Sequence, residues 1–227
     1  MAKRPIFISK KSGPQLVIAM PIEFVWHPGL SKSQKQKSIQ SLHESAKKAR
    51  GIERILEISS KSETELGVQF SAFNLMLSSG GFSGAVEVFF QGSKVFSQGG
   101  PFTDIYRMTS RAAKKDERLR GSGKLIAFRY NNREWPLNPQ TVFYDWLYLS
   151  ALRQNAKLSE RLLDFDGFSD IEFNPEKSIN CQAAAAALYK ALTERDLIDV
   201  ALSSPDEFIK IHDSQKKAKA PIQEGLF

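Results

Sequence analysis

Hydrophobic and polar positions alternate with different periods along the chain, and each change of period predicts a new element. Residues 5–29 contain short runs rich in Val, Ile and Phe, separated by a Ser-Gly-Pro sequence, which predicts strands and a hairpin. Residues 31–51 then place Ile39, Leu42 and Ala46 at helical spacing among basic residues. The pattern predicts a helix with one narrow apolar edge and a broad cationic face.

The same criteria predict the remaining elements in chain order. They are a strand in 54–62, another strand and its exit in 66–77, a helix over 85–97, a loop and a charged helix in 99–119, a hairpin in 125–137 turning at Asn131-Asn132, a long helix in 139–165 capped by Thr141, and an alanine-rich helix in 181–198 capped by Ser178 or Asn180. Helices outnumber strands, so we expect a mainly helical α+β fold with a small β-sheet.

Length and composition favour one globular domain. The chain has 227 residues, of which 41% are apolar and 25% charged. We expect a basic strand and helix extension over 1–50 packed on a core of 51–202, and a polar tail over 203–227 that is partly disordered. A membrane helix needs roughly 20 consecutive apolar residues, which the chain lacks, so we expect a soluble cytoplasmic protein.

The types of residue present exclude some chemistry. One cysteine cannot form an internal disulfide or a multi-cysteine zinc site, and the three histidines lack the spacing of metal ligands. We therefore expect neither a bound metal nor another cofactor.

Charge is distributed unevenly along the chain. Residues 1–50 contain ten basic and two acidic residues, a net charge of +8, whereas the other 177 residues contain 22 basic and 23 acidic ones, a net charge of −1. Clustered cations gain binding energy by displacing counterions from phosphates, which favours a surface that faces a polyanion; the alternative is a solvated face that aids solubility. The candidate DNA-binding residues are Lys32, Lys35, Lys37, Lys47, Lys48 and Arg50.

Three polar residues interrupt the apolar segment VEVFFQGSKVF at 86–96. At about 100° per residue, Glu87, Gln91 and Lys94 share one narrow stripe of the predicted helix. Either the stripe reaches solvent along the edge of a core helix, or it lines a cavity in which a carboxylate and an amine serve proton transfer or nucleophilic attack.

Two further segments carry candidate chemistry. Asp145 is the only charge in three helical turns of large apolar residues, so it requires a partner, a pocket or the positive end of its helix dipole. Trp146 beside it either stacks on a base or ribose or packs in the core. The segment SDIEFNPEKSINCQA at 169–183 places acidic and amide side chains around a proline turn, which suits phosphate binding or simple helix capping.

Taken together, VEVFFQGSKVF, FYDWLYLSALRQNAKLSERLLDF and DIEFNPEKSINCQAAAAALY resemble the NADAR family of NAD- and ADP-ribose-related, YbiA-like proteins over roughly residues 66–195. Together with LEISSKS and GGP, they are most similar to NADAR proteins paired with DarT-type toxins that modify DNA. The chain departs from the YbiA-like pattern in two places. It has FSAFN where those proteins have Leu-Ser-Asn-Phe, and it has DIEFNPEKSIN where they have an acidic stretch that contains Trp-Gly.

This resemblance implies a NADAR fold and an antitoxin that removes ADP-ribose from guanine bases of DNA. The implied partners are ADP-ribosylated DNA, single-stranded DNA included, ADP-ribose as product, and the cognate toxin. Three alternatives remain open: a non-catalytic module that binds ADP-ribose or ADP-ribosylated DNA, an N-glycosidase acting on a riboflavin-pathway nucleotide, and a protein that only sequesters the toxin.

The resemblance also implies roles for individual residues. Glu87 would stabilise the positive charge of the transition state, and Lys94 would attack the anomeric carbon to form a Schiff base. Asp145 would act with them as an acid or base. The candidate ligand-binding residues are Lys61, Ser62, Ser71, Asn74, Gln91, Gly99, Gly100, Trp146, Glu172, Asn174 and Asn180.

Overall fold

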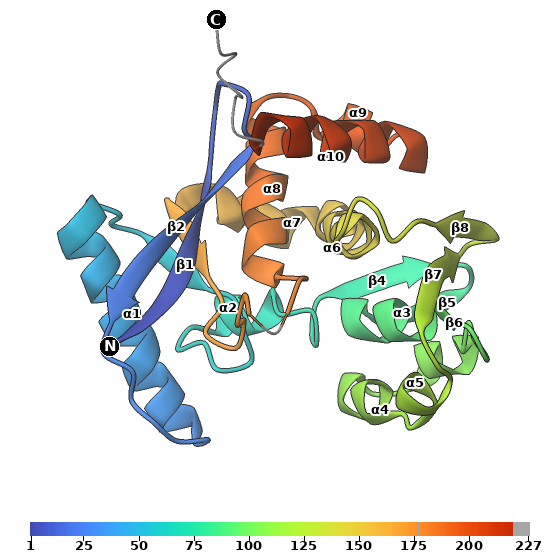
Figure 1. Cartoon of the computed structure of the whole chain (residues 1–227). Coiled ribbons are helices and arrows are strands. Elements are labelled where there is room, and N and C mark those ends of the chain that lie inside the picture. The colour runs from blue at the N-terminus through green and yellow to red at the C-terminus, as the bar shows by residue number, and fades with distance from the viewer. Residues whose placement is uncertain (177, 220–227) are drawn as a thin grey trace, which may run out of the picture.

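A computed structural model describes residues 1–176 and 178–219 of the chain, which form an α+β fold (Figure 1). The strands are β1 (Ala2–Ser9), β2 (Val17–Phe24), β3 (Ile55–Glu57), β4 (Met76–Ser79), β5 (Phe82–Ala85), β6 (Lys94–Phe96), β7 (Leu125–Tyr130), β8 (Arg133–Trp135) and β9 (Gly167–Ser169). The longer helices are α1 (Lys32–Arg50), α6 (Val142–Gln154), α8 (Gln182–Glu194) and α10 (Pro205–Lys219). The short ones are α2 (Glu65–Gln69), α3 (Val86–Gly92), η1 (Thr103–Arg107), α4 (Ser110–Lys115), α5 (Arg118–Gly121), α7 (Ala156–Ser159), η2 (Glu160–Asp164) and α9 (Ile198–Ala201).

The largest sheet joins the N-terminal hairpin to strands from later in the chain. Its strand order is β2-β1-β9-β3, with β1 antiparallel to β2 and β9, and β9 parallel to β3. Alternate side chains of β1 face opposite sides, since Ile6 packs with the apolar edge of α1 while Phe7 joins the main core around α6 and α8. Residues 1–50 thus share a sheet with residues 167–169; the domain boundaries at 50 and 202 stay predictions.

Two smaller sheets support the other half of the molecule. β4 and β5 form a hairpin that leads directly into α3, and β6, β7 and β8 form an antiparallel sheet. Helix α6 packs between α3 and α8. Every residue of α3 is buried, as expected for a helix that is apolar around most of its circumference.

Several predicted elements are confirmed. The N-terminal hairpin forms, and α1 begins after Ser31, whose Oγ accepts from the Gln34 amide, and ends at Gly51 with φ 66°. The hairpin of β7 and β8 turns at Asn131-Asn132, both with positive φ.

Other predicted elements are wrong in their extent or type. Residues 66–77 contain α2 and a turn before β4, because Thr64 caps a short helix through its hydroxyl. The predicted helix 85–97 ends at Gly92, and Lys94 begins β6. The long helix in 139–165 ends at Gln154 and continues as α7 and η2.

Of the two predicted helix caps, the one at Thr141 has the right position and the one before the alanine-rich helix is wrong. Thr141 occupies the N-cap of α6 but has φ 69° and makes no side-chain bond to the helix backbone. Cys181, not Ser178 or Asn180, occupies the N-cap of α8.

The polar tail begins as a helix rather than a disordered segment. In α10, Phe208 is buried against Trp146 of α6, with ring centroids 5.5 Å apart. The remainder of the tail, 220–227, lies outside the described residues. Among the helices that the structure describes, none is long and apolar enough to cross a membrane.

Arg195, just after α8, holds the loop between β1 and β2. Its guanidinium donates to the carbonyl oxygens of Lys10, Ser12, Gly13 and Gln15 at 2.7–3.0 Å. We predict that Arg195→Ala lowers the free energy of unfolding by about 2 kcal/mol, since four backbone acceptors lose a charged donor in one step. Urea denaturation measures the change, with Arg161→Ala as control for loss of an exposed arginine. Equal stability of the two variants would contradict the prediction.

Candidate functional site

A carboxylate, an amide and an amine form one hydrogen-bonded series at the end of α3. Gln91 Nε2 donates to Glu87 Oε1 at 2.9 Å, and Lys94 Nζ donates to Gln91 Oε1 at 2.7 Å. Glu87 and Gln91 are four residues apart on the helix, so their side chains lie on the same face. Lys94 is on β6 instead, and yet the tight bend at Gly92 and Ser93 brings its ammonium to the same stripe.

Two glycines allow other segments to pack closely against this bend. A Cβ on Gly92 would lie 2.6 Å from the Tyr106 ring, and a Cβ on Gly100 would lie 2.3 Å from the Lys94 carbonyl oxygen. Gly100 also has φ 87°, a conformation that residues with a Cβ rarely adopt. Gly100 therefore positions the backbone of Lys94.

The carboxylate end of the series opens into a cavity of about 370 Å³, here called the Glu87 cavity. Its polar lining comes from the β3–α2 loop, the residues before β4, α3, α4, α6 and the segment between β9 and α8. The polar residues are Ser59, Ser60, Ser71, Glu87, Gln91, Lys114, Tyr144, Asp170, Glu172, Ser178, Asn180 and Gln182. Phe73, Phe90, Phe173 and Ile179 line it as well.

The amine end opens into a neighbouring cavity of about 340 Å³, the Lys94 cavity, which is mostly apolar. The two cavities adjoin, since Phe90, Tyr144, Ile179 and Asn180 line both. A ligand that occupied both would place its central part against the Glu87–Gln91–Lys94 series. The combined size is in the range typical of cofactor and nucleotide sites.

Burial changes the chemistry of Lys94. Its Nζ lies 4.8 Å from the centroid of the Phe90 ring. Removal from water lowers the pKa of the amine below its ordinary value, the Glu87 carboxylate opposes this, and the Lys114 charge lowers it further. A larger fraction of Lys94 is therefore neutral near pH 7 than of an exposed lysine, and a neutral amine is the nucleophilic form.

A pair of buried carboxyl groups, Glu57 and Asp170, lies at the Glu87 cavity, and Asp170 is the one that lines it. Burial and the Glu57 charge raise the pKa of Asp170, although the Glu172 and Phe173 amides donate to its Oδ1 at 3.0 and 3.2 Å. Burial also raises the pKa of Glu57, against hydrogen bonds from the Ile171 amide and two serine hydroxyls. Asp170 lines the Glu87 cavity, so a carboxyl group that retains its proton faces the site.

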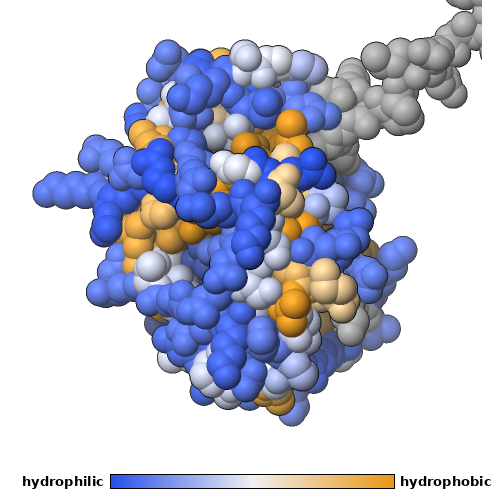
Figure 2. All heavy atoms as spheres, turned by 90° about the vertical axis from the view of Figure 1, so that its left-hand side faces the viewer, coloured by the Kyte–Doolittle hydropathy of each residue, from blue (hydrophilic) through white to orange (hydrophobic). Residues whose placement is uncertain are grey.

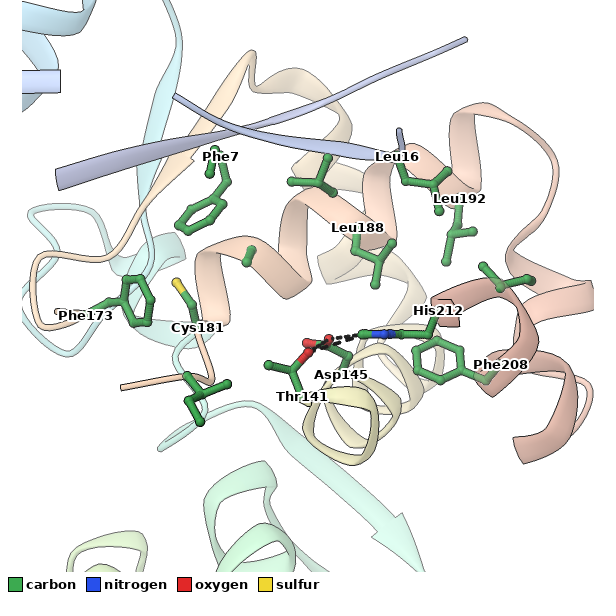
Figure 3. A pocket seen from close by; sticks show the side chains of 15 residues that line it. Phe7, Leu16, Thr141, Asp145, Phe173, Cys181, Leu188, Leu192, Phe208 and His212 are labelled. Carbon is green, nitrogen blue, oxygen red and sulfur yellow. Dashed lines mark hydrogen bonds and ion pairs between the residues drawn. The ribbon is translucent and has the colours of Figure 1, made fainter. Parts of the chain in front are cut away.

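Asp145 lies in a different cavity from Glu87 and Lys94. Figure 3 shows it with Thr141 and His212 in a mostly apolar cavity of about 240 Å³ between β1, β2, α8 and α10. Thr141 Oγ1 donates to Asp145 Oδ2 at 2.7 Å, and His212 Nε2 lies 2.9 Å from the same oxygen. Asp145 has the partner that its apolar surroundings require, and its predicted catalytic role has no geometric support.

The structure brings together only part of the predicted ligand-binding set. Ser71, Gln91, Glu172 and Asn180 line the Glu87 cavity, whereas the other seven line none of the three cavities; these are Lys61, Ser62, Asn74, Gly99, Gly100, Trp146 and Asn174. Asn74 Nδ2 donates to Ser71 Oγ at 2.8 Å, and Asn174 Oδ1 accepts from the Glu176 amide. Trp146 packs between Trp135 and Phe208, so the core interpretation of this residue fits its position.

The six basic residues of α1 are not equivalent. Lys35 pairs with Glu172 of the Glu87 cavity at 3.3 Å and is mostly buried, and Lys47 pairs with Glu53. Lys32, Lys37, Lys48 and Arg50 are exposed and have no ion pair among the described residues. Figure 2 shows the largely hydrophilic face to which α1 belongs.

Several lining residues of the Glu87 cavity are absent from the predicted ligand-binding set. Asp170 and Gln182 belong to the polar segment 169–183 that the sequence singles out around a proline turn. Tyr144 lies on α6 beside Asp145 but on the face toward Phe90, and burial raises its pKa well above the ordinary value. Nothing in the sequence pattern distinguishes it from a core tyrosine.

Metal and thiol chemistry find no support in the described part of the chain. No group of three or more His, Cys, Asp or Glu side chains there could hold a metal ion. Burial raises the pKa of Cys181 well above its ordinary value, which keeps the thiol protonated and unreactive.

The chain matches a family model described as DarT1-associated NADAR antitoxin over residues 2–221, a range that includes the Glu57–Asp170 pair and the Glu87–Gln91–Lys94 series. No curated protein matches the chain.

The raised pKa of Asp170 predicts a pH-dependent effect of Asp170→Asn. Between the unfolded pKa near 4 and the higher folded pKa, the folded wild type binds more protons than the unfolded chain, so its stability falls as pH rises. The asparagine variant does not lose stability in this way. We therefore expect the free energy of unfolding of the variant, relative to that of wild type, to increase by at least about 1 kcal/mol from pH 5 to pH 8.5. Urea denaturation at both pH values tests this, with exposed Asp164→Asn as control. A pH-independent difference would mean that Asp170 is ionised in the folded protein.

Proposed function

Because the chain belongs to the family of DarT1-associated NADAR antitoxins, we propose that it is a hydrolase that removes ADP-ribose from guanine bases of DNA. This activity would reverse the modification made by a DNA ADP-ribosyltransferase toxin, which is its partner in the cell. The observation that carries the proposal is the Glu87–Gln91–Lys94 series at the junction of two cavities.

Cleavage of a bond between a ribose anomeric carbon and a base nitrogen develops positive charge on the sugar. In this proposal the Glu87 carboxylate stabilises that charge, and the hydrogen bond from Gln91 keeps the carboxylate in place. Asp170 carries a proton at neutral pH and lines the same cavity, so it is suited to protonate the departing guanine.

Lys94 supplies the nucleophile. Its neutral amine bonds to the anomeric carbon while the bond from that carbon to guanine breaks and guanine leaves with the electron pair and a proton. The ribose ring then opens as the lysine nitrogen transfers a proton to the ring oxygen, which gives a Schiff base. Addition of water to this carbon expels the lysine amine and releases ADP-ribose.

We predict that Lys94→Met and Glu87→Gln each reduce release of ADP-ribose from a modified oligonucleotide by roughly 10³-fold or more. Both substitutions keep the approximate side-chain volume, and circular dichroism and thermal melting confirm that each variant folds. Lys157→Met, an exposed lysine away from the cavities, serves as the matched control. Full activity of both cavity variants would exclude the catalytic role of the series. Binding of the modified oligonucleotide without turnover by wild type would instead identify a non-catalytic binding module.

A second prediction concerns the covalent intermediate. Sodium borohydride added during turnover reduces a Schiff base to a stable amine, so we expect the mass of ADP-ribose on the peptide that contains Lys94. Lys94→Met should give no adduct on that peptide, and exposed lysines should give equal background labelling in both proteins. Rapid turnover by wild type without an adduct would leave Lys94 an electrostatic role only.

A further inference from the structure

A second basic region, which the overall charge count conceals, lies in the middle of the chain. Residues 104–124 contain seven basic and three acidic residues, a net charge of +4. The basic residues are Arg107, Arg111, Lys114, Lys115, Arg118, Arg120 and Lys124, and the acidic ones are Asp104, Asp116 and Glu117. Helices α4 and α5 present most of them on one part of the fold, here called the α4–α5 surface.

Two of the three acidic residues of this region pair with a single arginine. Arg118 donates to both carboxylate oxygens of Asp104, at 3.1 and 2.7 Å, and to both of Asp116, at 2.9 and 2.7 Å. Arg111 and Lys115 are exposed and have no ion pair among the described residues. The surface therefore presents unpaired positive charge to solvent.

The α4–α5 surface begins at the mouth of the Glu87 cavity. Lys114 of α4 lines that cavity, and its Nζ lies 5.2 Å from the centroid of the Phe73 ring, which lines it too. Ser110 Oγ, at the start of α4, donates to the Phe73 carbonyl oxygen at 2.8 Å. This bond fixes the basic helix to the loop that carries the half-buried aromatic ring.

On α1, the lysine that contacts a residue of the cavity lining is already engaged. Lys35 of α1 pairs with Glu172 and lies 4.7 Å from the centroid of the Trp26 ring. Figure 1 shows α1 and α4 on opposite sides of the molecule, with α2 between them. Free positive charge next to the cavity is thus supplied by α4 rather than by the adjoining part of α1.

We propose that the α4–α5 surface holds the DNA strand that carries the modified guanine, with Arg111 and Lys115 on its phosphates and Phe73 against a base at the cavity mouth. This inference rests on the proposed function, since a strand whose ADP-ribose occupies the cavities must cross their mouth. Exposed cations release counterions from the phosphates, and an aromatic ring stacks on any base. The arrangement suits single-stranded DNA, whose bases are free to stack.

The double variant Arg111→Gln/Lys115→Gln tests this surface against Lys157→Gln/Arg161→Gln, which removes the same charge from α7 and η2. We expect KM on an ADP-ribosylated single-stranded oligonucleotide to rise roughly tenfold at moderate salt, with a salt dependence weaker by about 1.4 in log–log slope. Turnover of ADP-ribosylated deoxyguanosine, which has no DNA backbone, should equal that of wild type. The control should match wild type on both substrates.

Three results would overturn the proposal. The first is a KM of the α4–α5 variant equal to that of the control. The second is a rise in KM caused by Lys32→Gln/Lys37→Gln on α1 instead. The third is an α4–α5 variant that loses binding to the toxin and keeps its affinity for DNA. If wild type cleaves neither substrate, the proposed function fails on its own. Fluorescence anisotropy with an unmodified single-stranded oligonucleotide still tests the surface in that case, because it needs no turnover.

Discussion

The Gln91 amide is the interaction on which the candidate site depends. It donates to a buried carboxylate and accepts from a partly buried amine, so neither Glu87 nor Lys94 is left without a partner. A carboxylate and an ammonium in direct contact would hold each other in their charged forms. The intervening amide keeps them apart, and burial is then free to favour the neutral, nucleophilic amine.

The buried pair of Glu57 and Asp170 also keeps a group in its neutral form. Two carboxyl groups buried near each other cannot both ionise cheaply, so the pair retains a proton. Glu57 ends β3 and Asp170 follows β9, and these strands are parallel neighbours in the largest sheet. The sheet thus brings together two residues that are more than a hundred positions apart, and it ties the site to the N-terminal hairpin through β1.

Much of the fold could be predicted from local pattern, and the errors have clear physical causes. The predicted helix over 85–97 is too long. The spacing of Glu87, Gln91 and Lys94 fits one helix, but the same three side chains also meet when the helix ends at Gly92 and Lys94 lies on a strand. The shared stripe was nevertheless right, since the tight bend returns Lys94 to it. The sequence predicts that Asp145 needs a partner but does not identify it, because that partner, His212, comes from a helix 67 residues away.

The sequence by itself determined which residues could form α1, α3 and the hairpins, because periodicity, caps and turn residues act over a few neighbours. It also determined that the Glu87–Gln91–Lys94 series would be surrounded by apolar side chains. Only the tertiary structure decided that Asp170 lines the same cavity as Glu87 and Gln91, that Tyr144 lies at the junction of two cavities, and that Lys114 of α4 lines one of them. Those relations depend on contacts between distant segments, and no local pattern encodes them.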